Sequence, residues 1–360
     1  MGARVLGRTG LKVNEIGMGG IPIIDVPFKR AVKVVRRAYE MGINYFDTAR
    51  AYRDSEAKMG EALKDVRGEI YLATKGNSYQ TAPNAKEAGK RAMEDLETSL
   101  RELKTDYVDV WQVHDVSTRR RWELTVGPGG VLDAIRKAKE KGYVRFIGMS
   151  SHNLEVLKKA VESDLFDVIL LVYNLAINDT AEIIERAKER NIGVAVMKPH
   201  SGGIFFSQQK GEDRITPWIS WWFVLSNPGI SVALCGARRI KDLEDALRAS
   251  RRVERVGPMP EEEAAKWVAI AKGYGEDVCR ACQYCTLHCP EGIQVHIVMQ
   301  LYDHAKAFPY EWPKHRSTYQ SLEKNFEDCT KCRKCERACP FDLPILQRFE
   351  EAHKKFMGEV

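Results

Sequence analysis

The amino-acid sequence predicts an α/β protein in two parts: a closed (β/α)8 barrel and, after it, a smaller module rich in cysteine. Apolar strand candidates alternate with segments of helical spacing over about 250 residues, the usual length of such a barrel. Eight of the nine cysteines then fall between Cys279 and Cys339. A charged segment that closes on Gly257-Pro258 separates the two patterns.

The elements follow one another in a regular order. Two short strand candidates flank the turn Arg8-Thr9-Gly10. Eight apolar strand candidates come next: Ile16–Met18, Tyr45–Asp47, Ile70–Thr74, Val108–Val113, Val144–Met149, Val168–Tyr173, Val194–Met197 and Ser231–Cys235. Helical spacing marks segments between them, among them Arg30–Tyr39, Lys86–Leu103, Val131–Lys139, Leu154–Val161 and Ala181–Arg190. Several of these segments end near a glycine suited to a left-handed cap: Gly42, Gly142 and Gly193.

An open doubly wound sheet is the alternative architecture. Such sheets carry a glycine-rich phosphate-binding turn after the first strand. Here Gly17-Met18-Gly19-Gly20 does not lead into a helix of that kind. The sequence therefore favours the closed barrel.

The domain boundaries follow from the same patterns. We expect the barrel over residues 1–256, a linker helix within 257–278 and the cysteine module over 279–360. The linker helix is indicated by Pro260 near its start and by acidic residues in its first turn.

Composition limits the classes of function. Apolar residues make up 44% and charged residues 29% of the chain, and the net charge of +6 is mild, so we expect no nucleic-acid partner. The apolar run Trp221–Leu225 is too short for membrane insertion. Met1–Gly20 has scattered charges rather than a signal peptide. Because the cysteines are concentrated in one module rather than spread as in secreted scaffolds, we place the protein in the cytoplasm.

The cysteines form two runs with the same spacing, C-x2-C-x2-C-x3-C-P. The first run is Cys279, Cys282, Cys285 and Cys289, and the second is Cys329, Cys332, Cys335 and Cys339. This spacing is typical of ligands to 4Fe–4S clusters, so two copies predict two clusters. Structural zinc sites or disulfides are the alternative, but zinc sites normally use two separated C-x2-C pairs or a mixture of cysteine and histidine.

The module resembles dicluster ferredoxin domains. Its long insert, residues 291–328, has a helical stretch at Val295–Ala305 and looks like the α-helical form of these domains. In this resemblance the fourth cysteine of each run binds the other cluster. It implies two ligand sets: Cys279, Cys282, Cys285 and Cys339, and Cys329, Cys332, Cys335 and Cys289. Four basic residues in the second run either guide an acidic redox partner or form a solvated face: Lys331, Arg333, Lys334 and Arg337.

Polar residues follow three successive strand candidates of the barrel. Asp47, Lys75 and His114 stand at strand ends and Tyr52 just beyond one. In a barrel those ends face one pocket. A buried carboxylate is costly unless it is paired, so we expect Lys75 to pair with Asp47. Taken singly, each of the four has an ordinary structural explanation, as a helix cap, a rim residue, a solvated charge or a core histidine. Together they indicate catalysis.

The same residues carry a resemblance to the aldo-keto reductase family. The matching motifs are Phe46-Asp47-Thr48-Ala49-x-x-Tyr52, then Ala73-Thr74-Lys75-Gly76, then Asp109-Val110-Trp111-Gln112-Val113-His114. The whole chain looks like an aldo-keto reductase fused to a 4Fe–4S dicluster domain. The resemblance implies carbonyl reduction with Tyr52 as proton donor. We expect Lys75 to lower the pKa of Tyr52, Asp47 to hold Lys75, and His114 to orient the carbonyl oxygen.

The resemblance also implies contacts to a nicotinamide cofactor. Ser150 and Ser151 match the region that holds the carboxamide, whereas Leu170 and Met197 depart from the family pattern. The expected pyrophosphate loop contains Pro199, Ser201, Gly202 and Gly203, and the expected 2′-phosphate loop contains Gly236, Arg238 and Arg239. Arginine suits a phosphate, which favours NADP(H). NAD(H) stays open, because Gly236 and Asp242 replace basic residues common in the family.

The sequence therefore predicts an oxidoreductase that reduces a small aldehyde or ketone with NAD(P)H. The two clusters would exchange electrons with a partner protein or regulate the enzyme. The alternative is a nicotinamide-binding electron-transfer or redox-sensing module with little carbonyl turnover. We also expect the long loop over residues 115–130 to be a lid over the site.

Overall fold

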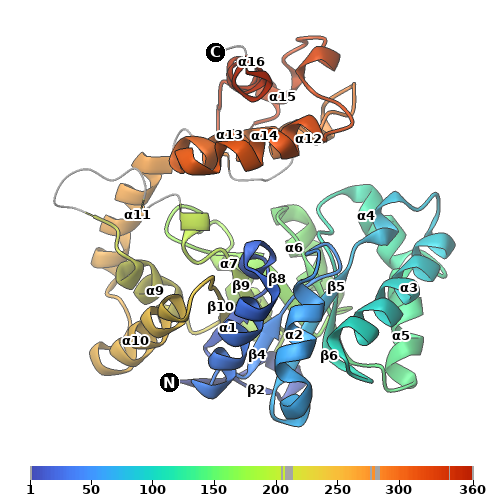
Figure 1. Cartoon of the computed structure of the whole chain (residues 1–360), viewed down its shortest axis with the longest axis vertical. Helices are drawn as coiled ribbons and strands as arrows, with labels where there is room; N and C mark the ends of the chain where they lie inside the picture. Colours follow the sequence, from blue (N-terminus) through green and yellow to red (C-terminus); the bar gives the residue numbers. More distant parts are fainter. Residues whose placement is uncertain are drawn as a thin grey trace. The chain divides into compact units, whose positions relative to one another are not determined.

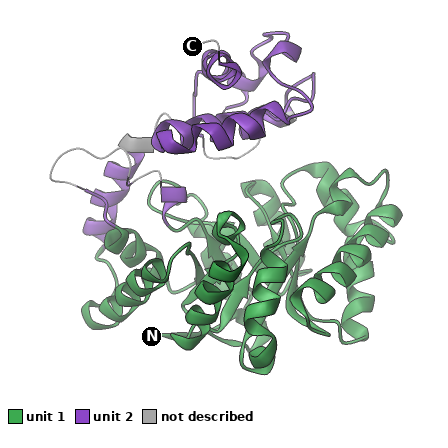
Figure 2. Cartoon of the chain, viewed as in Figure 1, with its two compact units in different colours: residues 1–199, 217–260 green, residues 200–216, 261–360 purple. Residues whose placement is uncertain are grey.

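The structure, a computed structural model, describes residues 2–203, 206, 214–275, 278–279, 284–339 and 341–358. The chain divides into two compact units (Figure 2). Unit 1 comprises residues 1–199 and 217–260, and unit 2 comprises residues 200–216 and 261–360. Within the described residues, no helix is long and apolar enough to cross a membrane.

A closed barrel of eight parallel strands forms the centre of unit 1, as the sequence predicts (Figure 1). The strands pair in the order β10-β3-β4-β5-β6-β7-β8-β9, and β9 pairs with β10. They are β3 (Ile16–Gly19), β4 (Tyr45–Asp47), β5 (Tyr71–Gly76), β6 (Val108–Val113), β7 (Val144–Ser150), β8 (Val168–Val172), β9 (Gly193–Met197) and β10 (Val232–Gly236). Closure excludes the open sheet, since an open sheet would leave two edges unpaired.

Helices connect the strands and cover the barrel. They are α1 (Phe28–Glu40), α2 (Ser55–Leu63), α3 (Ala85–Leu103), α4 (Arg119–Val126), α5 (Val131–Glu140), α6 (Leu154–Ser163), α7 (Ala181–Glu189), α9 (Pro217–Ser226) and α10 (Ile240–Val256). Each of the longer helices buries one apolar stripe. In α1 the buried residues are Ala31, Val34, Val35 and Ala38, the spacing of a helix that packs one face on a core.

An N-terminal hairpin closes the amino-terminal end of the barrel. Strands β1 (Ala3–Val5) and β2 (Lys12–Asn14) pair antiparallel. Leu6, which follows β1, and Val13 of β2 are buried with Tyr45 in the barrel core. Gly7 has a φ of +49°, and a Cβ there would lie 2.2 Å from the backbone nitrogen of Gly193, so only glycine fits this approach. Functional groups are therefore left to the opposite, carboxyl-terminal rim.

Two segments differ from the sequence-based expectation. The loop over residues 115–130 contains a helix, α4, whose N-terminus is capped by Thr118 through a hydrogen bond from Arg121 N. The charged segment after residue 250 is helical too, because α10 continues to Val256 and ends at Gly257 with a φ of +80°. Charged residues spaced along one helix face are compatible with a helix whose other face is buried.

Unit 2 is mainly α-helical in its described part, which confirms the predicted class. Its helices are α11 (Glu261–Gly275), α12 (Tyr284–Leu287), α13 (Val295–Ala307), α14 (Trp312–Gln320), α15 (Lys334–Arg337) and α16 (Ile345–Met357), with the 3-10 turns η5 (Ser201–Gly203), η6 (Pro309–Glu311) and η7 (Phe326–Asp328). A hydrophobic cluster that includes Val298, Tyr302, Tyr319 and Phe349 forms its core. Several cysteines are partly buried against this cluster.

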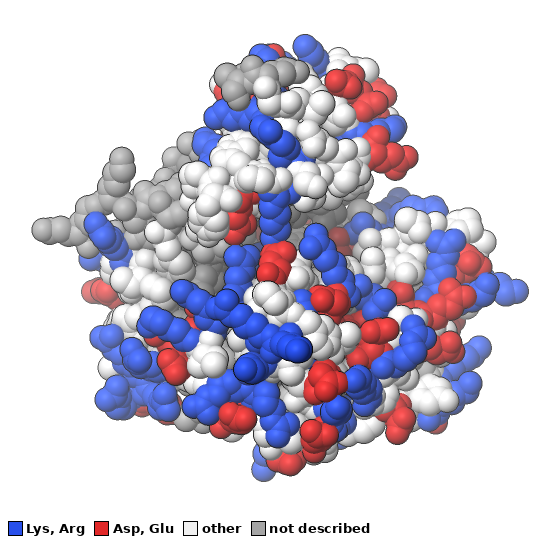
Figure 3. Space-filling view, viewed as in Figure 1, with Lys and Arg blue, Asp and Glu red and all other residues white. Residues whose placement is uncertain are grey.

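Charged side chains of both signs are mixed on the surface drawn in Figure 3. Ion pairs within or between neighbouring helices are common in the described part of the chain, such as those of Arg186 with Glu162 and Glu189. Exposed pairs of this kind contribute about 0–1 kcal/mol each, so packing rather than surface charge dominates the stability of the fold.

Candidate active site and cluster-binding cysteines

The four predicted catalytic residues come from three neighbouring strands. Asp47 is the last residue of β4, Lys75 lies near the end of β5, and His114 directly follows β6. Tyr52 lies in the turn after β4. Because β4, β5 and β6 are parallel and adjacent, their carboxyl ends meet at one rim. The structure brings all four side chains together there.

Lys75 and Asp47 form a buried ion pair. Lys75 Nζ donates hydrogen bonds to Asp47 Oδ1 and, at 2.7 Å, to the carbonyl oxygen of Thr48. Gln112 Nε2 donates to Asp47 Oδ2 at 2.8 Å. Lys75 is 0% exposed, which excludes a solvated charge. Burial lowers the pKa of Lys75 and raises the pKa of Asp47, and the attraction between the two opposes both shifts.

Tyr52 and His114 lie against each other beside this pair. Their ring centroids are 5.6 Å apart and their planes meet at 84°, an edge-to-face contact. Lys75 Nζ lies 5.2 Å from the centroid of the Tyr52 ring. A phenol, an imidazole and a buried ammonium group thus share one small site, and all three can stabilise negative charge on an oxygen atom.

The pKa of Tyr52 is raised, which is opposite to the net lowering expected from its neighbour Lys75. Burial has the largest effect, and the carboxylates of Asp47 and Asp115 raise the pKa further. The positive charge of Lys75 does not reverse this, because Asp47 balances it at hydrogen-bonding distance. Tyr52 is therefore protonated at neutral pH, which is the form that a proton donor requires.

His114 is neutral in this environment. Burial lowers its pKa to about 3, and the charge of Lys75 lowers it as well. The backbone carbonyl of His114 accepts hydrogen bonds from Tyr79 Oη at 3.0 Å and Gln80 Nε2 at 2.8 Å, which fixes the position of the residue. Among the described residues its buried Nδ1 has no hydrogen-bond partner.

A second polar group, centred on Asp115, was not predicted. Arg121 Nη1 and Ser117 Oγ donate to the carboxylate of Asp115, and His152 Nδ1 lies 3.3 Å from it. Although burial opposes the effect, these hydrogen bonds and the charge of Arg121 hold the pKa of Asp115 well below its usual range. The sequence signal is weak, since Arg121 and His152 come from separate segments, α4 and the loop after β7.

Four cysteines of unit 2 line one hollow. These are Cys289, Cys329, Cys332 and Cys335, together with Ile293, Val295, Leu346 and Phe349. They are the ligand set that the dicluster resemblance implies, with one cysteine from the first run and three from the second. Thiolates are the soft ligands that iron–sulfur clusters use, and the apolar walls limit water around them. The residues present fit a 4Fe–4S cluster.

The other implied ligand set is Cys279, Cys282, Cys285 and Cys339. Cys282 lies outside the described residues. Cys285 is buried in the hydrophobic cluster, and Cys279 and Cys339 are partly buried against it. Asp303 Oδ2 accepts a 2.7 Å hydrogen bond from Cys279 N, which anchors the start of the first run to α13, and Asp303 Oδ1 pairs with Arg348. None of the eight described cysteines forms a disulfide bond.

Sequence comparison identifies the family of the barrel. The model of the aldo/keto reductase family matches residues 15–217, more than half of the 360-residue chain. The chain belongs to the aldo/keto reductase family. A 4Fe-4S dicluster domain matches residues 278–344, so this reductase also carries a dicluster domain after its barrel.

Individual relatives agree with this assignment. The chain is 27% identical to L-galactose dehydrogenase of Arabidopsis thaliana over 303 residues, which cover 74% of this chain and 93% of that protein. It is 24% identical to the uncharacterized oxidoreductase YqkF of Bacillus subtilis over 286 residues, covering 69% and 91% of the two chains. An aldo-keto reductase from Bacillus halodurans in its holo form has the same fold, with a TM-score of 0.62, 24% identity and coverage of 75% and 96%.

The two serines expected at the carboxamide lie at the end of β7, and Pro199 of the expected pyrophosphate loop follows β9. Ser150 Oγ accepts a 2.9 Å hydrogen bond from Asp115 N, and Ser151 Oγ lies 3.3 Å from Ser117 Oγ. Both serines are buried. The carbonyl oxygen of Pro199 accepts a 2.6 Å hydrogen bond from Ser220 Oγ. The two serines thus join the polar group around Asp115, next to the tetrad residue His114.

The expected 2′-phosphate loop follows β10. Arg239 pairs with Asp242 at 2.8 Å, and Asp242 also accepts hydrogen bonds from the backbone nitrogens of Arg238 and Arg239. The Arg239 side chain is 63% exposed. Gly236 is the last residue of β10 and is exposed. A phosphate in this loop would therefore compete with Asp242 for the Arg239 guanidinium.

The rest of the expected pyrophosphate loop, after Pro199, belongs to unit 2. Ser201, Gly202 and Gly203 form the turn η5, with φ values of +49°, +68° and +88°. Gly203 N donates to the carbonyl oxygen of His200 at 2.8 Å. Successive left-handed residues of this kind occur in loops whose backbone nitrogens approach a ligand.

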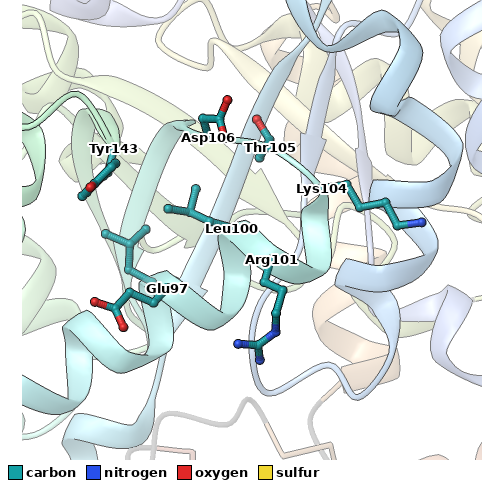
Figure 4. Close-up of a pocket in the computed structure, with 8 residues that line it drawn as sticks. Glu97, Leu100, Arg101, Lys104, Thr105, Asp106 and Tyr143 are labelled. Atoms are coloured by element: carbon teal, nitrogen blue, oxygen red, sulfur yellow. The ribbon is translucent and has the colours of Figure 1, made fainter.

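A groove at the other end of the barrel strands does not belong to the candidate active site. It is lined by the C-terminal part of α3 and the segment leading into β6, with Tyr143 just before β7 (Figure 4). Its Lys104 forms an ion pair with Glu61 of α2. The groove thus lies at the amino ends of the strands, and none of the four predicted catalytic residues lines it.

Proposed function

We propose that this protein reduces an aldehyde or ketone with NAD(P)H, that Tyr52 is the general acid, and that two 4Fe–4S clusters couple or regulate the reaction. The observation that supports this most strongly is the convergence of Tyr52, His114 and the buried Lys75–Asp47 pair at one rim of the barrel. Membership of the aldo/keto reductase family supports a small carbonyl compound as the substrate.

Each of the four residues has a role that follows from its surroundings. Tyr52 keeps its proton until negative charge develops on the carbonyl oxygen, and an alkoxide is basic enough to take that proton despite the raised pKa of the phenol. Lys75, held by Asp47 and the Thr48 carbonyl, stabilises the phenolate that Tyr52 then becomes. Neutral His114 orients the carbonyl oxygen without adding charge. When bound, the reduced nicotinamide supplies the hydride.

The nucleotide contacts are proposed on the same basis. Ser150 and Ser151 would hold the carboxamide, and Pro199 with Ser201, Gly202 and Gly203 the pyrophosphate. Gly236, Arg238 and Arg239 would form the loop at the adenosine end. The two arginines support NADP(H), because a guanidinium matches a phosphate in charge and geometry. The pairing of Arg239 with Asp242 keeps NAD(H) as the alternative.

The cysteines would hold the two clusters in the sets described above, which assigns a role to all eight cysteines of the module. We propose that they exchange electrons with a partner protein in the cytoplasm, where thiols stay reduced. Lys331, Arg333, Lys334 and Arg337 are exposed beside the cluster-lining cysteines, and they would suit an acidic surface on that partner.

The test is NADPH oxidation by the anaerobically purified protein with a panel of aldehydes and ketones. Tyr52→Phe removes only the acidic hydroxyl, so we expect turnover to fall at least about 100-fold while the cofactor Kd stays unchanged. The matched control is Tyr45→Phe, because Tyr45 is a tyrosine near Tyr52 in sequence, at the start of β4, that packs in the hydrophobic core with Leu6 and Leu11 of the N-terminal hairpin. Tyr45→Phe should keep wild-type turnover.

A nicotinamide-binding electron-transfer module is the second candidate. The exposed basic residues beside the cluster cysteines favour it, since electron transfer needs a docking surface and no carbonyl chemistry. Equal turnover of Tyr52→Phe and wild type on every carbonyl compound would overturn the reductase proposal and leave this candidate. The electron-transfer activity would then be measured as the reduction of the clusters by NADPH, followed by the change in cluster absorbance.

A further inference from the structure

Three side chains of unit 2 converge outside both proposed sites. His304 comes from α13, Glu311 from the turn η6 and His315 from α14. His304 Nδ1 lies 3.0 Å from His315 Nε2. Glu311 Oε2 lies 3.4 Å from His304 Nδ1 and 3.3 Å from His315 Nε2. Two imidazole nitrogens and one carboxylate oxygen therefore occupy the corners of a small, nearly regular triangle.

The local fold holds this triangle in place. Phe308 N donates to the carbonyl oxygen of His304 at 2.8 Å, and Glu311 N to that of Phe308 at 2.9 Å, so the turn from α13 to α14 is tightly hydrogen-bonded. Glu311 and His315 are four residues apart and lie on one face of the helical segment. The ring of Phe308 packs on that of His304, with centroids 4.7 Å apart. The three groups thus meet without a flexible segment between them.

The dimensions of the triangle match those of a metal site. Nitrogen and oxygen ligands lie about 2.0–2.2 Å from zinc, and two ligands of a tetrahedral ion at that distance are about 3.3–3.6 Å apart. Two of the observed separations, 3.3 and 3.4 Å, fall in this range, and the third, 3.0 Å between the two histidine nitrogens, is 0.3 Å shorter than its lower end. Two histidines and one glutamate are also a known ligand set of zinc.

Burial and access support the same conclusion. Glu311 and His315 are only 8% and 7% exposed, and a buried carboxylate is stabilised by a nearby cation. The side chain of His304 is 28% exposed, so an ion can reach the site from solvent. A divalent ion bound here would join the end of α13 to the start of α14.

We propose that His304, Glu311 and His315 bind a divalent transition-metal ion of the zinc class, separate from the iron–sulfur clusters. The ligands are nitrogen and oxygen atoms, which suit zinc, whereas the cysteine thiolates suit the clusters. The ion has a structural role, tying α13 to α14, and its binding does not depend on carbonyl reduction. The competing arrangement is a hydrogen-bonded triad of the same three side chains with no affinity for metal.

The experiment adds Zn²⁺ to the full, anaerobically purified chain and measures binding by calorimetry and by X-ray absorption at the zinc edge, to which iron does not contribute. We expect one Zn²⁺ per chain with nitrogen and oxygen ligands at about 2.0 Å and no sulfur at about 2.3 Å. Glu311→Gln and His304→Gln should each weaken binding at least tenfold. Iron and sulfide content, measured on every sample, reports whether unit 2 has folded.

His353→Gln is the matched control. His353 is a buried histidine of the same unit whose Nδ1 lies 2.8 Å from Tyr319 Oη, away from the triangle. This variant should bind Zn²⁺ as wild type does. A sulfur shell around zinc, or affinity in wild type no higher than in Glu311→Gln, would overturn the proposal. The absorption spectrum of wild type decides the question even if a variant fails to fold.

Discussion

The barrel site and the cysteine module organise their reactive groups in different ways. In the barrel, Asp47 contacts Lys75 and Gln112, which are 28 and 65 residues away in the chain, and the closed sheet sets their positions. In unit 2 the cysteines occur in two compact runs, and those that the structure describes lie on loops and on the four-residue helices α12 and α15. The barrel therefore preforms its site by packing, whereas the module depends on what its cysteines bind.

The energetic consequence is that the two regions should fail under different treatments. Helices of four residues are far below the length that is stable alone. The barrel strands, by contrast, are paired on both sides and almost completely buried.

If the cysteines hold the proposed clusters, removing the clusters should unfold much of unit 2 and leave the barrel folded. Metal binding to cysteine sites is worth on the order of 10 kcal/mol, more than a small helical module can replace. After anaerobic iron chelation we expect loss of cluster absorbance, a fall in helical circular dichroism and rapid proteolysis within residues 284–358. The barrel should survive as a protected fragment. A chelated chain with unchanged helical signal and protease resistance would contradict this view of the module.

Lys75→Met should do the reverse, destabilising the barrel while the clusters stay bound. It leaves the Asp47 carboxylate buried without its cation, and breaking a buried pair costs about 3–5 kcal/mol. The double variant Lys75→Met/Asp47→Leu removes both charges and should recover most of that loss, although both proteins should be inactive. Chemical denaturation measures the difference. A double variant as unstable as the single one would show that the charge is not the cause.

The contrast also explains what could be predicted from the sequence. The barrel was predictable because its strands are short apolar runs in regular alternation, and Asp47, Lys75 and His114 stood at their ends. Gln112 was not singled out, because its contact with Asp47 is set by the pairing of distant strands. Neither was the group around Asp115, which joins residues from two loops and α4.

The direction of the pKa shift of Tyr52 was mispredicted for a physical reason. Sequence shows which charges are neighbours but not how deeply a ring is buried, and burial is the largest influence on this phenol. The triangle of His304, Glu311 and His315 had a partial signal in the four-residue spacing of Glu311 and His315. Its third member depends on how α13 packs on α14, which the spacing does not show.

The stability of the barrel should fall as pH drops below 6.5, partly because of His114. Its pKa is about 3 in the folded protein, below the value of about 6.5 for an unfolded histidine. Between these values the unfolded chain binds the extra proton, so stability is present above pH 6.5 and is lost on acidification. Between pH 6.5 and 5, His114 should lower the free energy of unfolding by about 2 kcal/mol.

His114→Asn removes the titrating ring. The free energy of unfolding of the barrel should then fall less between pH 6.5 and 5, by the contribution of this residue. The profile is measured by denaturation at several pH values, with cluster absorbance recorded separately. His152 is also shifted downward by burial, so His152→Asn is the comparison that should give a change in the same direction. An unchanged slope in His114→Asn would mean that this imidazole is already charged in the folded protein.

The smallest effect concerns the choice of nucleotide. Arg239 is exposed and already paired with Asp242, so a contact with a 2′-phosphate should be worth about 1 kcal/mol or less. Arg239→Ala should therefore raise the KM for NADPH by no more than about fivefold and leave the KM for NADH unchanged. Asp242→Asn should lower the KM for NADPH, because it frees the Arg239 guanidinium from its ion pair. An asparagine can still accept the backbone hydrogen bonds at the start of α10. Equal changes for both nucleotides would show that Arg239 supports the loop and does not recognise the phosphate.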